Sequence, residues 1–404
     1  MTLTTEILRS ALENQAAFRR RRRLQPIEGA GAKIFPPTYP GPRKDDPAQH
    51  VFERRRIDGA ELWCVLVDSV QSQSNRLEEF LLESARQKLI ELPYVAVDFS
   101  EAQLDGLTEI TSLEAPHRLF DAILRDSELD STPFMKSEQG RKLVAAKPSD
   151  ASAIFELSPT ALLFGVWNST GEGGGLGAKF PRCLVSEVIG INVPVDESED
   201  NAISAGKRTG SRIDPLGVLR RVEVYKSKEG WDVDQKKAGK DAKKVRPSEI
   251  NHGNIAPTVQ NLGVTCDYIE QTSVVTLAGL RRLRFGSSDR DASARGVLAA
   301  LGLVALLEQD SRGFALRSRC DLVCDGAAPL ELVNFDGSTE AVELDLAGAR
   351  TLYADCVLAA RKAGFTFSSM PLVLKPQAKL VKIVQQSRDL ALAGEGGETA
   401  EAGV

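Results

Sequence analysis

The spacing of apolar residues predicts that helices and strands alternate along most of the chain. Apolar residues recur at helical intervals in four segments, namely 4–18, 74–90, 297–308 and 343–362, and a further helix is expected at 113–125. Apolar or alternating runs predict strands at 62–70, 94–99, 161–167, 182–193, 264–277, 314–323 and 370–374. Because the spacing between these elements is irregular, the pattern favours an α+β fold with insertions over a regular doubly wound sheet.

Three segments contain too few apolar residues to join a core. The connector 25–47 is rich in Pro and Gly, which predicts an extended conformation. Residues 196–257 are polar and charged, which indicates a long excursion or a mobile insertion. The last ten residues are acidic and are expected to be disordered.

Charge is distributed unevenly along the chain. The 404 residues carry a net charge of −5, which argues against a uniformly basic nucleic-acid-binding protein. However, Phe18–Arg23 reads FRRRRR, and residues 201–250 hold 13 Lys/Arg against 7 Asp/Glu. Local basic surfaces therefore stay open as sites for a polyanion. With neither a membrane-span pattern nor a signal-peptide pattern in the sequence, we expect a cytoplasmic protein without membrane contact.

The stretch WNSTGEGGGLGAKFPR (Trp167–Arg182) invites comparison with nucleotide-binding loops. It lacks the second glycine and the hydroxyl residue of a P-loop, and a strand rather than a helix is expected after it, so a dinucleotide fold does not fit either. Two interpretations remain open. The stretch is a flexible hairpin between two strands, or its backbone approaches a polyanion while Lys179 and Arg182 supply charge.

Catalytic and metal-binding chemistry finds little support in the sequence. The three histidines do not have metal-ligand spacing, and the six scattered cysteines are best explained as structural thiols. We therefore predict no catalytic residue, no metal and no cofactor. His117 is either a structural histidine or an RNA contact. Basic platforms for phosphates, or simply solvated faces, are expected at Arg281, Arg282 and Arg284 and at Arg317 and Arg319, which would share one strand face.

Several segments occur together in a recognisable order. They are RRLQPIEGAGAKIFPPTYPG, LVDSVQSQSNRLEE, SLEAPHRL, SPTALLFGVWNS, AKFPRCLVSEVIGINV, GSRIDPLG and LRSRCDLV. The ordered set, which covers roughly residues 22–323, resembles the backbone subunit of the type I-G (formerly I-U) CRISPR Cascade, a member of the RAMP superfamily. VDSVQSQSNRLE is its most specific part.

The resemblance implies a modified RRM (ferredoxin-like) palm with long insertions, one of them a thumb-like hairpin. On this basis residues 1–60 form an N-terminal helix, an arginine block and an extended connector. Residues 61–380 form the palm, with the thumb within 196–257, and residues 390–404 form a disordered acidic tail.

The resemblance also implies a non-catalytic role. Such subunits stack head-to-tail along a guide crRNA, the thumbs kink the guide, and the exposed bases pair with target DNA within an antiviral complex that contains other Cascade subunits. A low content of aromatic residues, 6%, agrees with RNA held through phosphates rather than through stacked bases. The alternative is a RAMP endoribonuclease that cuts guide precursor or target RNA, for which Asp214 is the aspartate to weigh.

The residues expected to contact RNA come from the basic stretches and from the motifs of the resemblance. Asn75 and Arg76 are expected where a strand meets a helix, and the alternative for Asn75 is that it caps that helix. Arg212 and Asp214 could equally form a structural pair. The full set is Arg21, Arg22, Arg23, Asn75, Arg76, His117, Arg118, Lys179, Arg182, Arg212, Arg281 and Arg282.

Overall fold

The computed structural model describes residues 1–392 except 42, 44–45, 170–176, 198–202, 205 and 229. Its centre is a nine-stranded sheet in which β20, β1, β18 and β10 lie side by side, each antiparallel to its neighbour. With helices α2 and α8 these strands follow the order β1–α2–β10–β18–α8–β20, which is the βαββαβ order of a ferredoxin-like or RRM palm. The predicted α+β class is confirmed. The bounds are β1 (Ala17–Pro26), α2 (Val70–Arg86), β10 (Leu184–Ile191), β18 (Tyr268–Thr276), α8 (Ser288–Arg312) and β20 (Cys320–Cys324).

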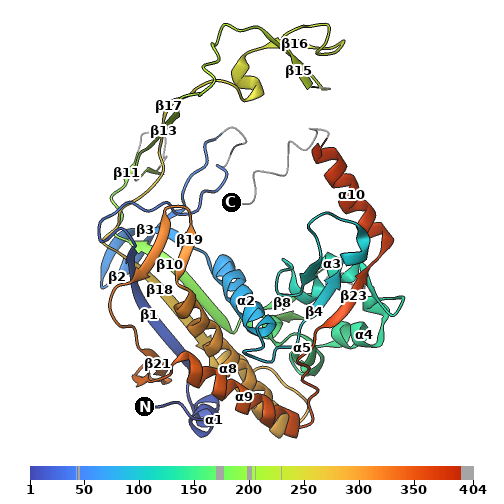
Figure 1. The fold of residues 1–404 in the computed structure, drawn as a ribbon. Coiled ribbons are helices and arrows are strands. Elements are labelled where there is room, and N and C mark those ends of the chain that lie inside the picture. The colour runs from blue at the N-terminus through green and yellow to red at the C-terminus, as the bar shows by residue number, and fades with distance from the viewer. Residues whose placement is uncertain are drawn as a thin grey trace.

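Additional strands widen this sheet on both sides. The hairpin of β2 (Phe52–Ile57) and β3 (Ala60–Asp68) extends it beyond β10, and β19 (Phe314–Arg317) extends it beyond β20. The hairpin of β21 (Leu330–Val333) and β22 (Thr339–Val342) pairs with the first residues of β1. Helices α2 and α8 cover one side of the sheet, and α9 (Leu346–Lys362) packs against α8 (Figure 1).

The arginine block forms β1 rather than a segment that precedes the palm. Helix α1 (Thr5–Asn14) begins after its N-cap Thr4 and ends at Asn14, four residues earlier than expected. The chain then becomes extended, and Phe18 and Leu24 are fully buried at the two ends of the arginine run. Burial alternates along β1 with the period of a strand, so this segment belongs to the core sheet.

A second, five-stranded sheet lies beside the palm. Its strands are β5 (Glu109–Thr111), β4 (Val95–Asp98), β23 (Leu372–Pro376), β6 (Ser127–Leu129) and β7 (Thr132–Pro133). The helices of this part are α3 (Ala122–Arg125), α4 (Glu138–Ala145), α5 (Ser152–Leu157), α6 (Pro159–Phe164) and α10 (Ala378–Leu392). Residues 390–392 thus end a helix, and the rest of the predicted tail lies outside the described residues.

Two secondary-structure predictions were wrong in this part. Residues 161–167, predicted as a strand, belong mainly to α6, and only Val166–Trp167 form strand β8. All six residues of α6 are buried, so their apolar run has no periodicity that distinguishes a helix from a buried strand. In 113–125, predicted as one helix, only the 3-10 turn η2 (Arg118–Phe120) and α3 are helical.

Residues 206–262, which we call the arm, project from the palm (Figure 1). Strands β13 (Arg208–Arg212) and β17 (Ile255–Gln260) pair as a two-stranded ribbon. The ribbon carries residues 223–252, which we call the tip. The tip contains a three-stranded sheet of β15 (Gly230–Asp232), β14 (Val224–Ser227) and β16 (Lys243–Val245), followed by the 3-10 turn η4 (Pro247–Ile250). β11 (Asp196–Glu197) and β12 (Ile203–Ser204) pair before the arm.

None of the helices in the described part of the chain has the length and apolar character to cross a lipid bilayer.

Candidate nucleic-acid interface

Two arginines of β1 point towards the helices and are buried. Arg20 and Arg22 are only 4% and 6% exposed, and both bind the carboxylate of Asp310 on α8. The Arg20 Nη1–Asp310 Oδ2 distance is 2.7 Å and the Arg22 Nη1–Asp310 Oδ1 distance is 2.5 Å. Arg22 is therefore a structural residue, and its prediction as an RNA contact fails because its guanidinium does not reach the surface.

The alternate arginines of β1 lie on the side of the sheet away from the helices. Arg19 pairs with Glu331, and Arg21 pairs with Glu270 on β18 at 3.0 Å. Arg23 is exposed and lies over the ring of Tyr268, 4.3 Å from its centroid. β1 and β18 are the middle strands of the palm, where an RRM carries base-stacking aromatic residues. Here that face is largely covered by neutralised charge, and Arg23 is the cation on β1 that has no carboxylate partner among the described residues.

Arg76 and Asn75 do not lie at a helix N-terminus. Helix α2 is capped by Ser69, whose Oγ accepts from Ser72 N, so it starts four residues earlier than predicted. Arg76 Nε lies 3.1 Å from a carboxylate oxygen of the fully buried Asp68. The other carboxylate oxygen of Asp68 forms an ion pair with Arg317. Asn75 is exposed in the second turn and caps nothing. The expected phosphate site at the N-terminus of this helix is therefore wrong.

A buried ion pair joins α2 to the loop that carries His117. Arg118 donates from Nε and Nη2 to the two carboxylate oxygens of Glu78, at 2.7 and 2.6 Å, and from Nη1 to Gly165 O at 3.1 Å. Burial raises the pKa of Glu78 to about 7, although the hydrogen bonds and charge of Arg118 act in the opposite direction. Arg118 is thus held by Glu78 and serves the fold rather than an RNA surface, while neighbouring His117 is exposed.

Arg182 lies beside this ion pair without a carboxylate of its own. Its Nε is buried and has no hydrogen-bond partner. Burial lowers the pKa of Arg182, and the nearby charge of Arg118 lowers it further. Arg118 binds Glu78 and Arg182 interacts with it through charge alone, so two guanidiniums lie near one carboxylate and the group carries a net positive charge. We call Glu78, Arg118, Lys179 and Arg182 the hairpin-base cluster.

Lys179 belongs to the glycine-rich hairpin. Strands β8 (Val166–Trp167) and β9 (Lys179–Phe180) pair, so the expected hairpin strands are present but short. Lys179 is exposed, with its Nζ 5.3 Å from the centroid of the Trp167 ring. Residues 170–176, which include most of the glycines, lie outside the described residues. The structure thus brings the predicted residues His117, Lys179 and Arg182 to one region, whereas no sequence signal pointed to Glu78, which binds Arg118 there.

The remaining arginines of the palm have mixed environments. Arg281 donates to Leu12 O and Gln15 O at the end of α1, at 2.8 and 2.9 Å, whereas Arg282 is exposed. Arg317 binds Asp68, and Arg319 lies in the turn between β19 and β20 with φ 57°. The expectation that Arg317 and Arg319 share one strand face is therefore wrong, because the chain reverses between them.

The arm differs from the palm in how its cations are neutralised. Within the described residues of the arm, the single ion pair joins Lys244 to Glu223. Arg212 is exposed on β13, and it makes no ion pair with Asp214. Asp214 instead accepts the N–H groups of Leu216 and Val218, at 2.9 and 3.2 Å. This aspartate stabilises a turn, which is the structural alternative to the nuclease role.

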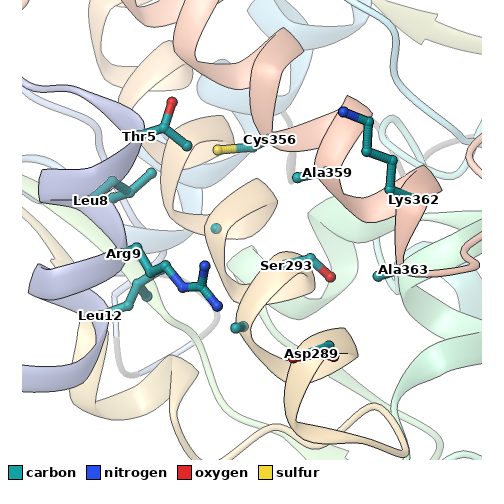
Figure 2. A pocket seen from close by; sticks show the side chains of 12 residues that line it. Thr5, Leu8, Arg9, Leu12, Asp289, Ser293, Cys356, Ala359, Lys362 and Ala363 are labelled. Carbon is teal, nitrogen blue, oxygen red and sulfur yellow. The ribbon is translucent and has the colours of Figure 1, made fainter.

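The palm also contains an apolar cavity of about 390 Å³ between α1, α8 and α9. Leu8, Leu12 and small residues line it, with Arg9 and Lys362 at its rim (Figure 2). Burial raises the pKa of the Cys356 thiol in its wall to about 12, so this thiol is protonated. Across the part of the chain that the structure describes, no three His, Cys, Asp or Glu residues are grouped as metal ligands.

Part of the chain is similar to a known protein family. Residues 18–195 match the family model described as CRISPR-associated protein GSU0053. The match starts in β1 and ends just after β10, so it includes the hairpin-base cluster but not the arm. No curated protein matches the chain. The match supports a CRISPR-associated protein with a role in CRISPR defence.

Proposed function

We propose that this CRISPR-associated protein is a non-catalytic guide-RNA-binding subunit whose copies stack head-to-tail along the crRNA to form the backbone of a Cascade surveillance complex. The observation that carries the proposal is the uneven neutralisation of cations. Among the described residues, arginines of the palm are mostly paired with carboxylates, whereas Lys179 and Arg182 of the hairpin-base cluster and most cations of the arm have no ion-pair partner. Unpaired cations on a projecting arm suit a phosphate backbone.

The mode of binding follows from what a guide must do. Its base edges have to stay free to pair with target DNA, so the protein must hold phosphates and sugars without regard to sequence. The middle strands of the palm suit this requirement, because they present Arg21, Arg23 and Glu270 where an RRM would stack bases. We assign the phosphate contacts to Lys179, Arg182 and Arg212, with Arg23, His117 and Arg282 as further exposed candidates.

Head-to-tail stacking is supported by the apolar surface of the arm. Ile213, Leu216 and Leu219 are 83%, 72% and 71% exposed, which is unusual for a stable free surface. A two-stranded ribbon such as β13–β17 is also marginally stable in water without a packing partner. A neighbouring copy would cover this surface, and a heterologous contact of this kind propagates into a filament. Other Cascade subunits would bind at the filament ends.

We assign no cleavage step to this subunit. The aspartate weighed for a nuclease role, Asp214, is engaged by two backbone N–H groups. Labelled RNA incubated with the protein and a divalent metal should therefore stay intact. Cutting that disappears in the Asp214→Ala variant would overturn the non-catalytic assignment.

Co-expression with a guide array tests the RNA-binding role. The purified chain should carry RNA of guide length, with a high ratio of absorbance at 260 to 280 nm, and should form curved filaments by negative-stain electron microscopy. A preparation free of nucleic acid, or one that contains only random host RNA, would refute the proposal.

A further inference from the structure

The tip of the arm carries an aromatic and cationic row on one face of its small sheet. Trp231 on β15 lies directly opposite Lys226 on β14, and Lys226 lies opposite Lys243 on β16. Residues directly opposite in an antiparallel sheet point to the same face, so the three side chains form one row. Trp231 is 49% exposed, and both lysines are exposed.

The opposite face of the same sheet is electrostatically different. Tyr225 pairs there with Asp232 and Lys244, and Lys244 is neutralised by Glu223. The tip as a whole holds 8 Lys/Arg against 6 Asp/Glu, so its net charge is small, and the positions of the lysines matter more than their number. Among the residues that the structure describes, neither Lys226 nor Lys243 has a carboxylate partner, and Lys226 Nζ donates to the backbone carbonyl of Glu249 at 3.2 Å.

Carboxylates near the row are largely engaged by the backbone of the tip. Asp232 Oδ1 accepts from Asp234 N at 2.8 Å, and Asp234 Oδ1 accepts from Lys236 N at 2.9 Å. Glu249 Oε1 accepts from Arg246 N at 2.9 Å. Each of these carboxylates accepts a backbone N–H group of a turn, and none of the three forms an ion pair with Lys226 or Lys243, which leaves the positive charge of both lysines available to a ligand.

We infer that the tip is a second nucleic-acid site, one that binds single-stranded nucleic acid through a base stacked on Trp231 and phosphates at Lys226 and Lys243. An exposed aromatic ring beside unpaired lysines is the combination that single-strand-binding surfaces use. A duplex offers phosphates but no free base face, so the tryptophan favours a single strand. Neighbouring strands lie about 4.8 Å apart, so the row spans roughly 10 Å and contacts only a few nucleotides.

The tip site goes beyond the proposed guide-binding function and does not depend on it. The tip is joined to the palm by the β13–β17 ribbon, whereas the hairpin-base cluster lies on the palm (Figure 1). One tip would bind weakly, and several tips in a filament would bind one strand with a large gain from multivalency. DNA and RNA share the chemistry that the row recognises, and the experiment separates them.

Anisotropy with short labelled oligothymidine, oligouridine and duplex DNA tests the site on the full chain. Lys226→Glu/Lys243→Glu should weaken oligothymidine binding by about tenfold or more and reduce the salt dependence by roughly 1.4 in log–log slope, for two phosphates on a single strand. Trp231→Ala should weaken it by about fivefold or more, and duplex binding should respond less to that change. Trp231→Phe should retain binding but lose the binding-induced quenching of tryptophan fluorescence.

Matched controls make the outcome decisive. Lys136→Glu/Lys147→Glu changes the charge equally at exposed lysines of the part that contains the five-stranded sheet, and should leave oligothymidine binding unchanged. Guide RNA that co-purifies should be retained by the tip variants. Wild-type oligothymidine affinity in both Trp231→Ala and Lys226→Glu/Lys243→Glu would overturn the inference, as would loss of guide RNA, which would assign the tip to the guide site. Absence of guide RNA together with tip-dependent oligothymidine binding would instead refute only the proposed function.

Discussion

Replacing Arg118 by methionine should produce a loss of stability that grows with pH. In the wild-type protein the guanidinium of Arg118 makes two hydrogen bonds to Glu78 and opposes the effect of burial on its pKa, which is about 7 on balance. Methionine fills much of the same space but removes both hydrogen bonds, and of the two guanidiniums only Arg182, which makes no hydrogen bond to Glu78, still favours the ionised carboxylate. Burial then raises the pKa of Glu78 further, by up to about two units towards the ~9 of other buried glutamates.

The sign and size of the pH effect follow from linkage. The folded pKa of Glu78 lies above its ordinary value of 4.5, so its contribution to stability is full below about pH 4.5 and is lost as pH rises through the folded pKa. At pH 5 the group is protonated in both folded proteins, and Arg118→Met costs about 1–3 kcal/mol for the lost hydrogen bonds. At pH 8 the carboxyl group of Glu78 is mostly ionised in the wild type but not in the variant. This difference adds up to about 1.4 kcal/mol to the stability that the variant loses relative to the wild type.

Thermal unfolding at the two pH values measures this difference. An unfolding entropy of about 2.1 cal/mol/K per residue over 404 residues gives roughly 0.85 kcal/mol/K, so the extra loss at pH 8 is between about 1 and 2 °C in Tm. Adding Glu78→Gln to Arg118→Met should abolish the pH dependence, because Gln imitates the protonated acid. Glu138→Gln, which breaks an exposed pair with Lys142, is the surface control and should show no shift. An equal difference in Tm between the wild type and Arg118→Met at pH 5 and at pH 8 would refute the reasoning.

Three further predictions concern the same parts of the molecule. Lys179→Glu/Arg182→Glu should weaken guide-RNA binding for all sequences and flatten its salt dependence, and an unchanged slope would remove both residues from the phosphate contacts. Asp310→Asn should destabilise the protein by about 3–5 kcal/mol in urea unfolding, because it leaves two buried guanidiniums without a carboxylate, and a loss below about 1 kcal/mol would contradict that account. Gly165→Ala should lower Tm more than Gly59→Ala, since both glycines have φ 84° but only the Cβ at 165 would meet Arg182 and Phe180 atoms at 3.0–3.1 Å; equal effects would show that the contact is irrelevant.

The sequence allowed the class of the fold to be predicted because most core strands have a clear pattern. The strands expected at 62–70, 94–99 and 182–193 appear as β3, β4 and β10. The position of the arginine block in the fold could not be predicted, because five consecutive charged residues indicate an exposed segment. Such residues are buried only where an acidic residue pairs with them. That acid, Asp310, lies 288 residues beyond Arg22 in the chain.

The candidate site was predictable only as separate pieces. Arg118 and Arg182 were selected from different motifs, and the charge of Glu78 acts on both, although a helical pattern marks Glu78 only as one more acidic residue. For the same reason the sequence overestimated the number of free arginines. An arginine that binds phosphate and one that binds a distant carboxylate look alike until the carboxylates are located in space.

The five arginines of β1 also bear on how the sheet finds its alignment during folding. A run of identical side chains contains no internal mark, so a slip of two residues would preserve the alternation of inward and outward charges. Phe18 and Leu24 remove this ambiguity, because each is fully buried at one end of the run. A shift of two residues would place an arginine in one of the two buried sites of Phe18 and Leu24. The other buried site would also receive a different residue. The two apolar residues thus determine the register of β1, because the arginine run between them could pair equally well in several registers.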